Sequence, residues 1–201
     1  MTPVFPTTYF GSIAYFRELV KYPSIQLEAH EHFIKQTYRS RCEILGANGI
    51  LSLSIPVKRP GGSRTPLTEI RLPPDENWRV RHWRAIKSAY QSAPYFDYYG
   101  TEVQELLLNG DDRLFSYNRT ILNRMLQWLD LEVSVDHTSE FVLPQPNDYR
   151  DGLVGKSGNF PPIPAPYIQV FPGEKNYHER LSMLDAIFCI GPLARNLILP
   201  R

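Results

Sequence analysis

The spacing of apolar residues at the start of the chain predicts a strand, a turn, a helix and a second strand. A short apolar run ends in a turn at 7–12, and apolar residues then recur at helical spacing from 13 to 20. Pro23 stops this helix, and segment 24–29 alternates as a strand does. This order is typical of a β-α-β unit with a parallel sheet, whose ligands collect at the carboxyl ends of the strands. That expected binding mouth contains Thr7, Thr8, Tyr9, Gly11 and Ser12.

The next alternating segment predicts an antiparallel hairpin whose first strand is unusually basic. The turn falls at 46–49, and residues 51–57 alternate apolar and polar side chains. One face of the first strand carries Phe33, Lys35, Thr37, Arg39, Arg41 and Glu43. Three cations around a hydroxyl, at steps of about 6.5 Å, match the span of a diphosphate or a sugar-linked anion. The pattern allows two interpretations, a solvated outer face or an anion-binding site.

The remainder of the chain predicts a helical middle and a C-terminal strand and helix. A strand is expected at 68–72, and helices are expected from Asp75 to Pro94, from 99 to 108 and from 113 to 129. Residues 138–166 are rich in Pro, Gly, Asn and Asp without a period, which indicates a long loop. A strand at 167–171 and a helix at 179–191 follow. The predicted fold class is α/β, with an N-terminal β-α-β start, a mixed sheet and hairpin, a helical middle and a C-terminal strand-helix.

The composition indicates one soluble domain spanning residues 1–201. With 201 residues, of which 42% are hydrophobic, the chain can bury a sizeable core. The first residues lack the features of a secretion leader, and no stretch approaches the ~20 apolar residues that a membrane span needs. Cys42 and Cys189 are too few and too far apart for a disulfide framework or a metal site. We therefore expect a cytoplasmic protein with two buried thiols.

Charge is distributed unevenly along the chain, although the net charge is only +1, which argues against a nucleic-acid-binding protein. Residues 35–87 hold eleven Lys or Arg against four acidic residues, a net charge of about +7. Residues 97–151 hold eleven acidic residues against four Lys or Arg, a net charge of about −7. The two stretches either attract each other within one fold or leave a basic surface for an anionic ligand.

The common catalytic motifs are absent from the sequence. It contains no GxSxG, HExxH, CxxC, GxGxxG or Walker sequence, so neither a metal nor a dinucleotide is indicated, and any cofactor stays unknown. His30 and His32 lie close together without a third ligand, which argues against a metal site. His82 shares a predicted helix face with Trp78 and is the best-placed general base, because an unperturbed imidazole titrates near neutrality. The alternative is a core histidine whose hydrogen bonds are satisfied.

Several segments resemble the WbqC-like family of bacteria, over nearly the whole chain except 138–166. The resemblance rests on FIKQTYRSRCEILGANGILSLSIPV at 33–57, on NWRVRHWRAIKSAYQSAPYF at 77–96, and on Ser182, Asp185, Gly191 and Pro192. The most specific positions are Lys35, Thr37, Tyr38, Arg41, Trp78, His82, Tyr90 and 94–96. Many members begin with His-Gln-Pro-Asn-Tyr, where this chain has Phe5-Pro6-Thr7-Thr8-Tyr9, and Ser40 stands where Asn is usual. The chain therefore looks like a divergent, Bacteroides-type branch, and no role is carried over from the N-terminal histidine.

The resemblance implies a transferase, because this poorly characterised family occurs in O-antigen and other surface-polysaccharide gene clusters and is associated with glycine transfer to an amino sugar. Acyl transfer of this kind needs cations for phosphates, a base for the acceptor ammonium and donors for the developing oxyanion. The catalytic candidates are His82, Lys35 and Thr37, and the substrate-binding candidates are Arg41, Tyr9, Thr8, Tyr38, Tyr90 and Arg39. The resemblance singles out Lys35, Thr37 and Arg41, with His82, as the lining of one pocket, and it leaves Arg39 as a candidate solvent-facing residue. The implied partner is an anionic small molecule such as a sugar nucleotide.

Two other functions stay open. The basic face can bind an anion without catalysis, as in a sugar-nucleotide-binding accessory protein. A strand, a turn and a helix carrying Gly11 also resemble the opening of nucleotidyltransferases, although the paired histidines with which those enzymes contact phosphates are absent. Ligand binding and turnover by substituted variants are needed to separate these alternatives.

Overall fold

The computed structural model describes residues 2–75, 77–154, 167–171 and 180–200, and its architecture is mixed α/β, as predicted. The strands are β1 (Val4–Phe5), β2 (Ser24–Leu27), β3 (Arg41–Gly46), β4 (Gly49–Ser54) and β5 (Ser134–His137). The α-helices are α1 (Ile13–Leu19), α2 (Asn77–Tyr90), α3 (Phe96–Leu108), α4 (Leu114–Trp128) and α5 (Met183–Ile190). Short 3₁₀ turns occupy Gly62–Arg64, Leu67–Glu69 and Gly191–Leu197.

Three strands form a parallel sheet in the order β1-β2-β5. Because α1 lies between β1 and β2 in the sequence, the predicted β-α-β start is confirmed. The Ser12 side chain caps α1 by accepting a hydrogen bond from the backbone N–H of Tyr15 at 3.1 Å. β5 was not predicted, since its residues are mostly polar and exposed and carry no apolar alternation. It nevertheless pairs with the whole length of β2.

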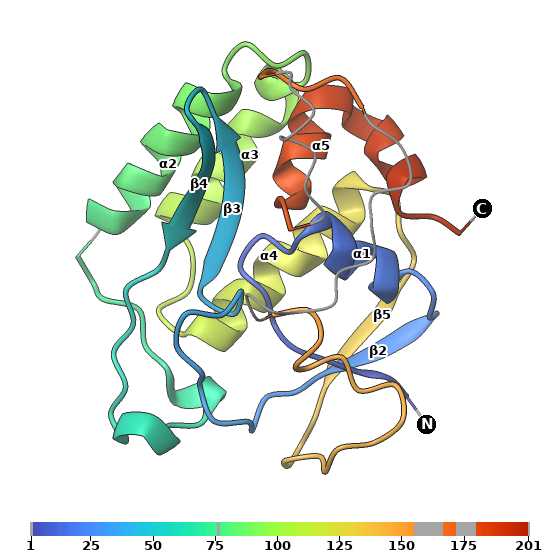
Figure 1. Ribbon diagram of the computed structural model, residues 1–201. Coiled ribbons are helices and arrows are strands. Elements are labelled where there is room, and N and C mark those ends of the chain that lie inside the picture. Colours follow the sequence, from blue (N-terminus) through green and yellow to red (C-terminus); the bar gives the residue numbers. More distant parts are fainter. Residues whose placement is uncertain (1, 76, 155–166, 172–179, 201) are drawn as a thin grey trace.

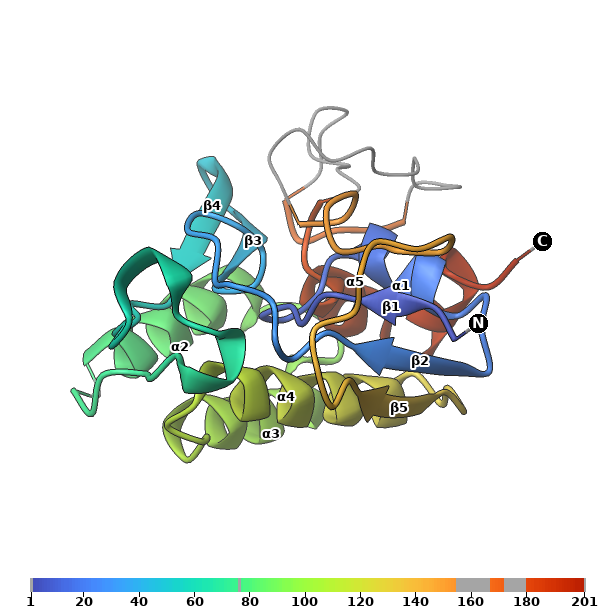
Figure 2. The same ribbon diagram turned by 90° about the horizontal axis from the view of Figure 1, so that it is seen from below.

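β3 and β4 form a separate antiparallel hairpin, which confirms the second predicted unit. The turn between Gly46 and Gly49 uses a φ of 103° at Gly49, a conformation that glycine adopts readily. Figures 1 and 2 show the hairpin and α2 at one end of the molecule and the parallel sheet at the other. α2 buries Trp78 and His82, which were predicted to share one face, and it also buries Ile86, Ala89 and Tyr90.

Two further predicted strands are wrong. Segment 68–72 begins within the 3₁₀ turn Leu67–Glu69. Of its residues only Arg71 forms isolated β-bridges to other described residues, one to Lys58 and one to Arg113. Residues 167–171 form no strand, since none of the described strands pairs with this segment, and the side chains of Tyr167 and Gln169 bond to Asp185. The loop expected at 138–166 is irregular as far as residue 154, and its remainder lies outside the described residues. The last predicted helix is confirmed at Met183–Ile190, where α5 ends at Gly191.

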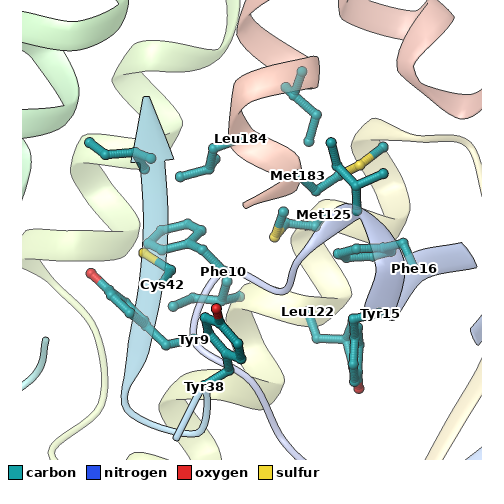
Figure 3. Close-up of a cluster of buried hydrophobic side chains, with 14 of the residues drawn as sticks. Tyr9, Phe10, Tyr15, Phe16, Tyr38, Cys42, Leu122, Met125, Met183 and Leu184 are labelled. Atoms are coloured by element: carbon teal, nitrogen blue, oxygen red, sulfur yellow. The ribbon is translucent and has the colours of Figure 1, made fainter. Parts of the chain in front are cut away.

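The turn at 7–12 is part of the core rather than an open mouth. The N–H of Met183 donates to the carbonyl of Gly11 at 2.9 Å, which docks the turn against the start of α5. Figure 3 shows Phe10, Met125 and Met183, from three separate segments, in one buried cluster. Thr8 is only 4% exposed, so a ligand does not reach it from solvent in this conformation. Within the described part of the chain, no helix combines the length and apolar composition that a bilayer crossing requires.

Candidate functional site

The segment predicted to be a basic strand is a series of turns up to residue 40, and β3 begins only at Arg41. Gln36 has a φ of 59°, in the left-handed region, which interrupts the alternation of faces. The Thr37 hydroxyl donates to the carbonyl of Ile34 at 2.9 Å and so stabilises a local turn. The expected row of three cations on one strand face is therefore wrong, and Lys35 lies exposed in one of these turns.

Arg39 is fully buried, which corrects the expectation that it faces solvent. Its Nε and Nη2 each donate to one carboxylate oxygen of Glu31 at 2.6 Å, and Nη2 also donates to the carbonyl of Arg150 at 3.2 Å. Burial raises the pKa of the Glu31 carboxyl, and the bonds from Arg39 oppose that shift. The hydrogen-bonding edge of Arg39 is therefore occupied by an internal ion pair rather than open to a substrate.

Arg41 is also buried, with 9% of the residue exposed, but the corresponding edge of its guanidinium is unpaired. Its Nε and Nη2 make no hydrogen bond to any described residue, and its Cζ lies 5.2 Å from the ring centroid of Tyr38. These are the same two atoms that Arg39 uses on Glu31. Because burying unpaired charged donors is unfavourable, this edge fits a carboxylate or phosphate that binds from outside the described residues.

His82 lies on the buried face of α2 and is 6% exposed. Its Nδ1 is 2.9 Å from the hydroxyl of Tyr9, which is itself fully buried. Burial lowers the pKa of His82 to about 4, although a hydrogen bond to the backbone of Ser54 partly offsets this effect. The imidazole is therefore neutral near pH 7 and bonded to another core side chain.

His82 and Arg41 lie on opposite faces of β3. Successive side chains of a strand point to opposite sides, so Arg41 and Cys42 diverge. Figure 3 shows Cys42 with Tyr9 and Phe10 in the buried cluster, and Tyr9 connects that side to His82. The structure therefore brings Tyr9 and His82 together, and separately brings Arg41 and Tyr38 together.

Tyr90 forms part of a buried cluster around Asp185. Its hydroxyl donates to Asp185 Oδ1 at 2.8 Å and accepts a hydrogen bond from the N–H of Leu45 at 3.1 Å. The hydroxyl of Tyr167 and the amide of Gln169 donate to the other Asp185 oxygen. This arrangement joins α2, β3 and α5, and a substrate-binding role for Tyr90 stays a prediction.

Charged residues that the sequence patterns did not single out meet at the carboxyl end of the parallel sheet. Glu28 and Thr138 directly follow β2 and β5, and the Thr138 hydroxyl donates to Glu28 Oε1 at 3.0 Å. Glu28 Oε2 accepts from Arg150 Nη1 at 3.1 Å, and Arg150 also pairs with Asp148. Glu28 is fully buried and Arg150 is 6% exposed. The position of Glu28 near the end of the predicted strand at 24–29 was a signal for this site, whereas Thr138 gave none because β5 was not predicted.

A pocket of about 310 Å³ lies beside these charged residues. We call it the sheet-edge pocket, and it is lined by Glu31, His32, Ile34, Phe141, Pro144, Asp148, Arg150 and Asp151. Ile34 and Phe141 are about half exposed and supply its apolar side. Its volume is at the lower end of those of small-molecule sites. Among the described residues, no group of three His, Cys, Asp or Glu side chains is placed to hold a metal ion.

The model of the WbqC-like protein family matches residues 7–154, which is 148 of the 201 residues. Neither a curated protein nor a solved structure matches the chain. The matched range includes Arg39, Arg41, His82 and the sheet-edge pocket, and it ends before Asp185. The C-terminal part of the resemblance therefore stays a prediction. Since the family model covers well over half of its length, the chain belongs to the WbqC-like protein family.

Proposed function

We propose that the chain is a transferase of bacterial surface-polysaccharide biosynthesis, which passes glycine or a similar acyl group to an amino sugar and holds an anionic substrate at Arg41. The observation that carries the anion site is the buried guanidinium whose Nε and Nη2 have no acceptor among the described residues. A phosphate or carboxylate accepts from both N–H groups at once and neutralises the charge, so it would compensate Arg41 for its burial. Membership in the WbqC-like family is consistent with this role.

The remaining candidates take supporting roles in this proposal. Lys35, in the turns before β3, supplies a second cation. Thr37 supplies a donor for the developing oxyanion only if its hydroxyl leaves the carbonyl of Ile34. His82 is neutral near pH 7 and is the candidate base for the proton of the acceptor amine, and its pKa of about 4 makes it a weak one. Because its Nδ1 faces the Tyr9 hydroxyl, that proton would pass through Tyr9.

A second function, a sugar-nucleotide-binding accessory protein without turnover, is favoured by one observation. Tyr9 and His82 are 0% and 6% exposed, so a substrate contacts them only after the surrounding chain moves. Both functions require Arg41 to bind an anion, whereas only the transferase requires His82. Binding and turnover therefore separate the two.

Titration calorimetry with a nucleoside-diphosphate sugar and with inorganic phosphate tests the anion site. In thermal unfolding at a ligand concentration about 100-fold above Kd, the free energy of unfolding of the wild-type protein should rise by ~2.7 kcal/mol. Arg41→Ala should abolish binding, and Arg41→Lys should weaken it because lysine keeps the charge and loses the fork. Arg84→Ala, which changes an exposed arginine of α2, is the matched control and should bind as the wild type does. Undiminished binding by both Arg41 variants would refute the anion site.

A turnover assay with a glycyl donor and an amino sugar tests the catalytic role. His82→Gln should keep anion binding and lose transfer, because glutamine can bond to Tyr9 and cannot accept a proton. If the wild-type protein binds the nucleotide sugar and transfers no glycyl group, the accessory function replaces the transferase. Transfer at the wild-type rate by His82→Gln would remove His82 from the mechanism.

A further inference from the structure

We propose that the sheet-edge pocket binds an amine-bearing sugar of hexosamine size through its ammonium group and the apolar face of its ring. The proposal goes beyond the proposed function, because it concerns a second ligand site and neither Tyr9 nor His82 lines the pocket. The pocket itself is separate from the unpaired edge of Arg41, which does not line it. Its charge, its apolar side and its position in the fold each support this ligand.

The sheet-edge pocket has a surplus of negative charge. The lining contains three carboxylates, those of Glu31, Asp148 and Asp151, and one guanidinium, that of Arg150, which amounts to a net charge of −2. Behind the lining, Arg39 pairs with Glu31 and Glu28 pairs with Arg150. Because Arg39 and Glu28 have opposite charges, together they leave the net charge unchanged. Asp151 is exposed and takes part in none of the ion pairs between described residues. An ammonium group therefore finds an unneutralised carboxylate here, whereas a phosphate would be repelled.

The apolar side of the sheet-edge pocket consists of two half-exposed side chains. Phe141 is 51% exposed and Ile34 is 49% exposed. Apolar side chains gathered at the rim of a polar pocket are typical of ligand contacts. An aromatic face also attracts a cation within about 6 Å of its centroid, as Phe141 already does with the Arg150 guanidinium at 5.1 Å.

The polar floor of the sheet-edge pocket is held rigidly by buried bonds. Arg150 donates to Glu28, to Asp148 and, at 2.8 Å, to the carbonyl of Val142. These bonds fix the carboxylate of Asp148 at the pocket wall. A buried ion network of this kind seldom stabilises a fold more than apolar side chains would, so its presence favours a role in positioning. It also lies at the carboxyl ends of β2 and β5, where ligands of parallel sheets collect.

Titration of the full chain with glucosamine, glucose and N-acetylglucosamine, followed by NMR and calorimetry, tests this ligand. Glucosamine should saturate the pocket with a Kd on the order of 1 mM. Glucose and N-acetylglucosamine should bind at least about tenfold more weakly, because neither offers an ammonium group to the carboxylates. Equal affinity for the three sugars, or no saturable binding of glucosamine, would overturn the proposal.

Two surface substitutions locate the binding without disturbing the core. Asp151→Asn and Phe141→Ala should each weaken glucosamine binding about tenfold, and thermal unfolding will show that both remain folded. Leu143→Ala, at a 75% exposed position of the same loop outside the pocket lining, is the matched control and should bind normally. Unchanged binding by both variants would place the sugar elsewhere and overturn the proposal. Because Arg41→Ala should retain glucosamine binding, a failure of the anion site stays distinguishable from a failure of this pocket.

Discussion

Arg39 and Arg41 lie two positions apart and are both buried, and they differ in what the Nε and Nη2 atoms of each guanidinium contact. The Arg39 atoms bond to Glu31, whereas those of Arg41 contact no acceptor among the described residues. A paired cation contributes to the fold that it is part of. A buried cation without a partner lowers the free energy of unfolding until a ligand binds to it.

Methionine substitutions should reveal this difference as free energies of unfolding. Arg41→Met should leave stability unchanged or raise it by about 1 kcal/mol, because it removes an unpaired guanidinium and keeps an apolar stem. Arg39→Met should lower stability by about 3–5 kcal/mol, since it leaves the Glu31 carboxylate buried without its partner. Urea unfolding near pH 7 measures both values. A loss at Arg41 as large as that at Arg39 would mean that Arg41 has a structural partner.

His82 should make stability depend on pH. Its pKa of about 4 in the folded chain is below the value of about 6.5 expected after unfolding, so the unfolded chain binds more protons between these values. The contribution is fully present above pH ~6.5 and is lost as the pH falls toward 4. Between pH 7 and pH 5 the wild-type protein should lose about 2 kcal/mol more than His82→Gln, as measured by urea unfolding. Equal losses would contradict a buried, neutral imidazole.

At the scale of elements, the carboxylate of Asp185 connects the start of α5 to α2 and, through Tyr90, to β3. Burial raises the pKa of Asp185, while hydrogen bonds from Tyr167, Gln169 and Tyr90 oppose the shift. Three neutral donors thus hold one buried acid between elements that are far apart in sequence.

Removal of one donor should weaken this connection measurably. Tyr90→Phe keeps the ring but leaves Leu45 N–H without its acceptor and Asp185 with one donor fewer, so stability should fall by roughly 2–3 kcal/mol. Thermal and urea unfolding measure the loss. The matched control is Tyr98→Phe on α3, whose residue is 72% exposed and whose loss should stay within about 0.5 kcal/mol. Similar stability of the two variants would mean that the cluster does not support the fold.

Elements with a local pattern could be predicted, and those defined by distant partners could not. The helix α2, with Trp78 and His82 on one face, and the turn at 46–49 are encoded within a few neighbouring residues, and both were predicted correctly. β5 is short and polar and is a strand because β2 lies beside it. The alternation at 33–40 wrongly predicted a strand. The left-handed backbone of Gln36 and the hydrogen bond from Thr37 to Ile34 form turns, and a two-residue hydrophobic period does not reveal them.

The same distinction applies to the candidate site. Arg41 could be singled out from its own segment, although its unpaired edge could not. Glu28 and Arg150 are separated by 122 positions, and no local pattern relates them. The burial of His82 was one of two open alternatives, and the structure places it in the core, with Tyr9 as its partner.

At the scale of the whole molecule, the basic and acidic stretches of the chain meet at the end of α3. Arg71 pairs with Asp112 at 2.9 Å on the surface. Arg79 of α2 donates to the carbonyls of Leu107, Gly110 and Asp111, so it is satisfied by the end of a helix rather than by a carboxylate. Both interactions attach the basic stretch to the acidic one, in line with an attraction within one fold.

The register of the parallel sheet determines when a growing chain can complete it. Ser24 of β2 pairs with Ser134 of β5, 110 positions later. At a synthesis rate of about 5–20 residues per second, β2 waits on the order of 5–20 seconds for its second neighbour to be made. The β3–β4 hairpin can close meanwhile, because its strands are adjacent in sequence. Until β5 emerges, one edge of β2, with Ile25 and Leu27, stays open to chaperones or to strands of other nascent chains.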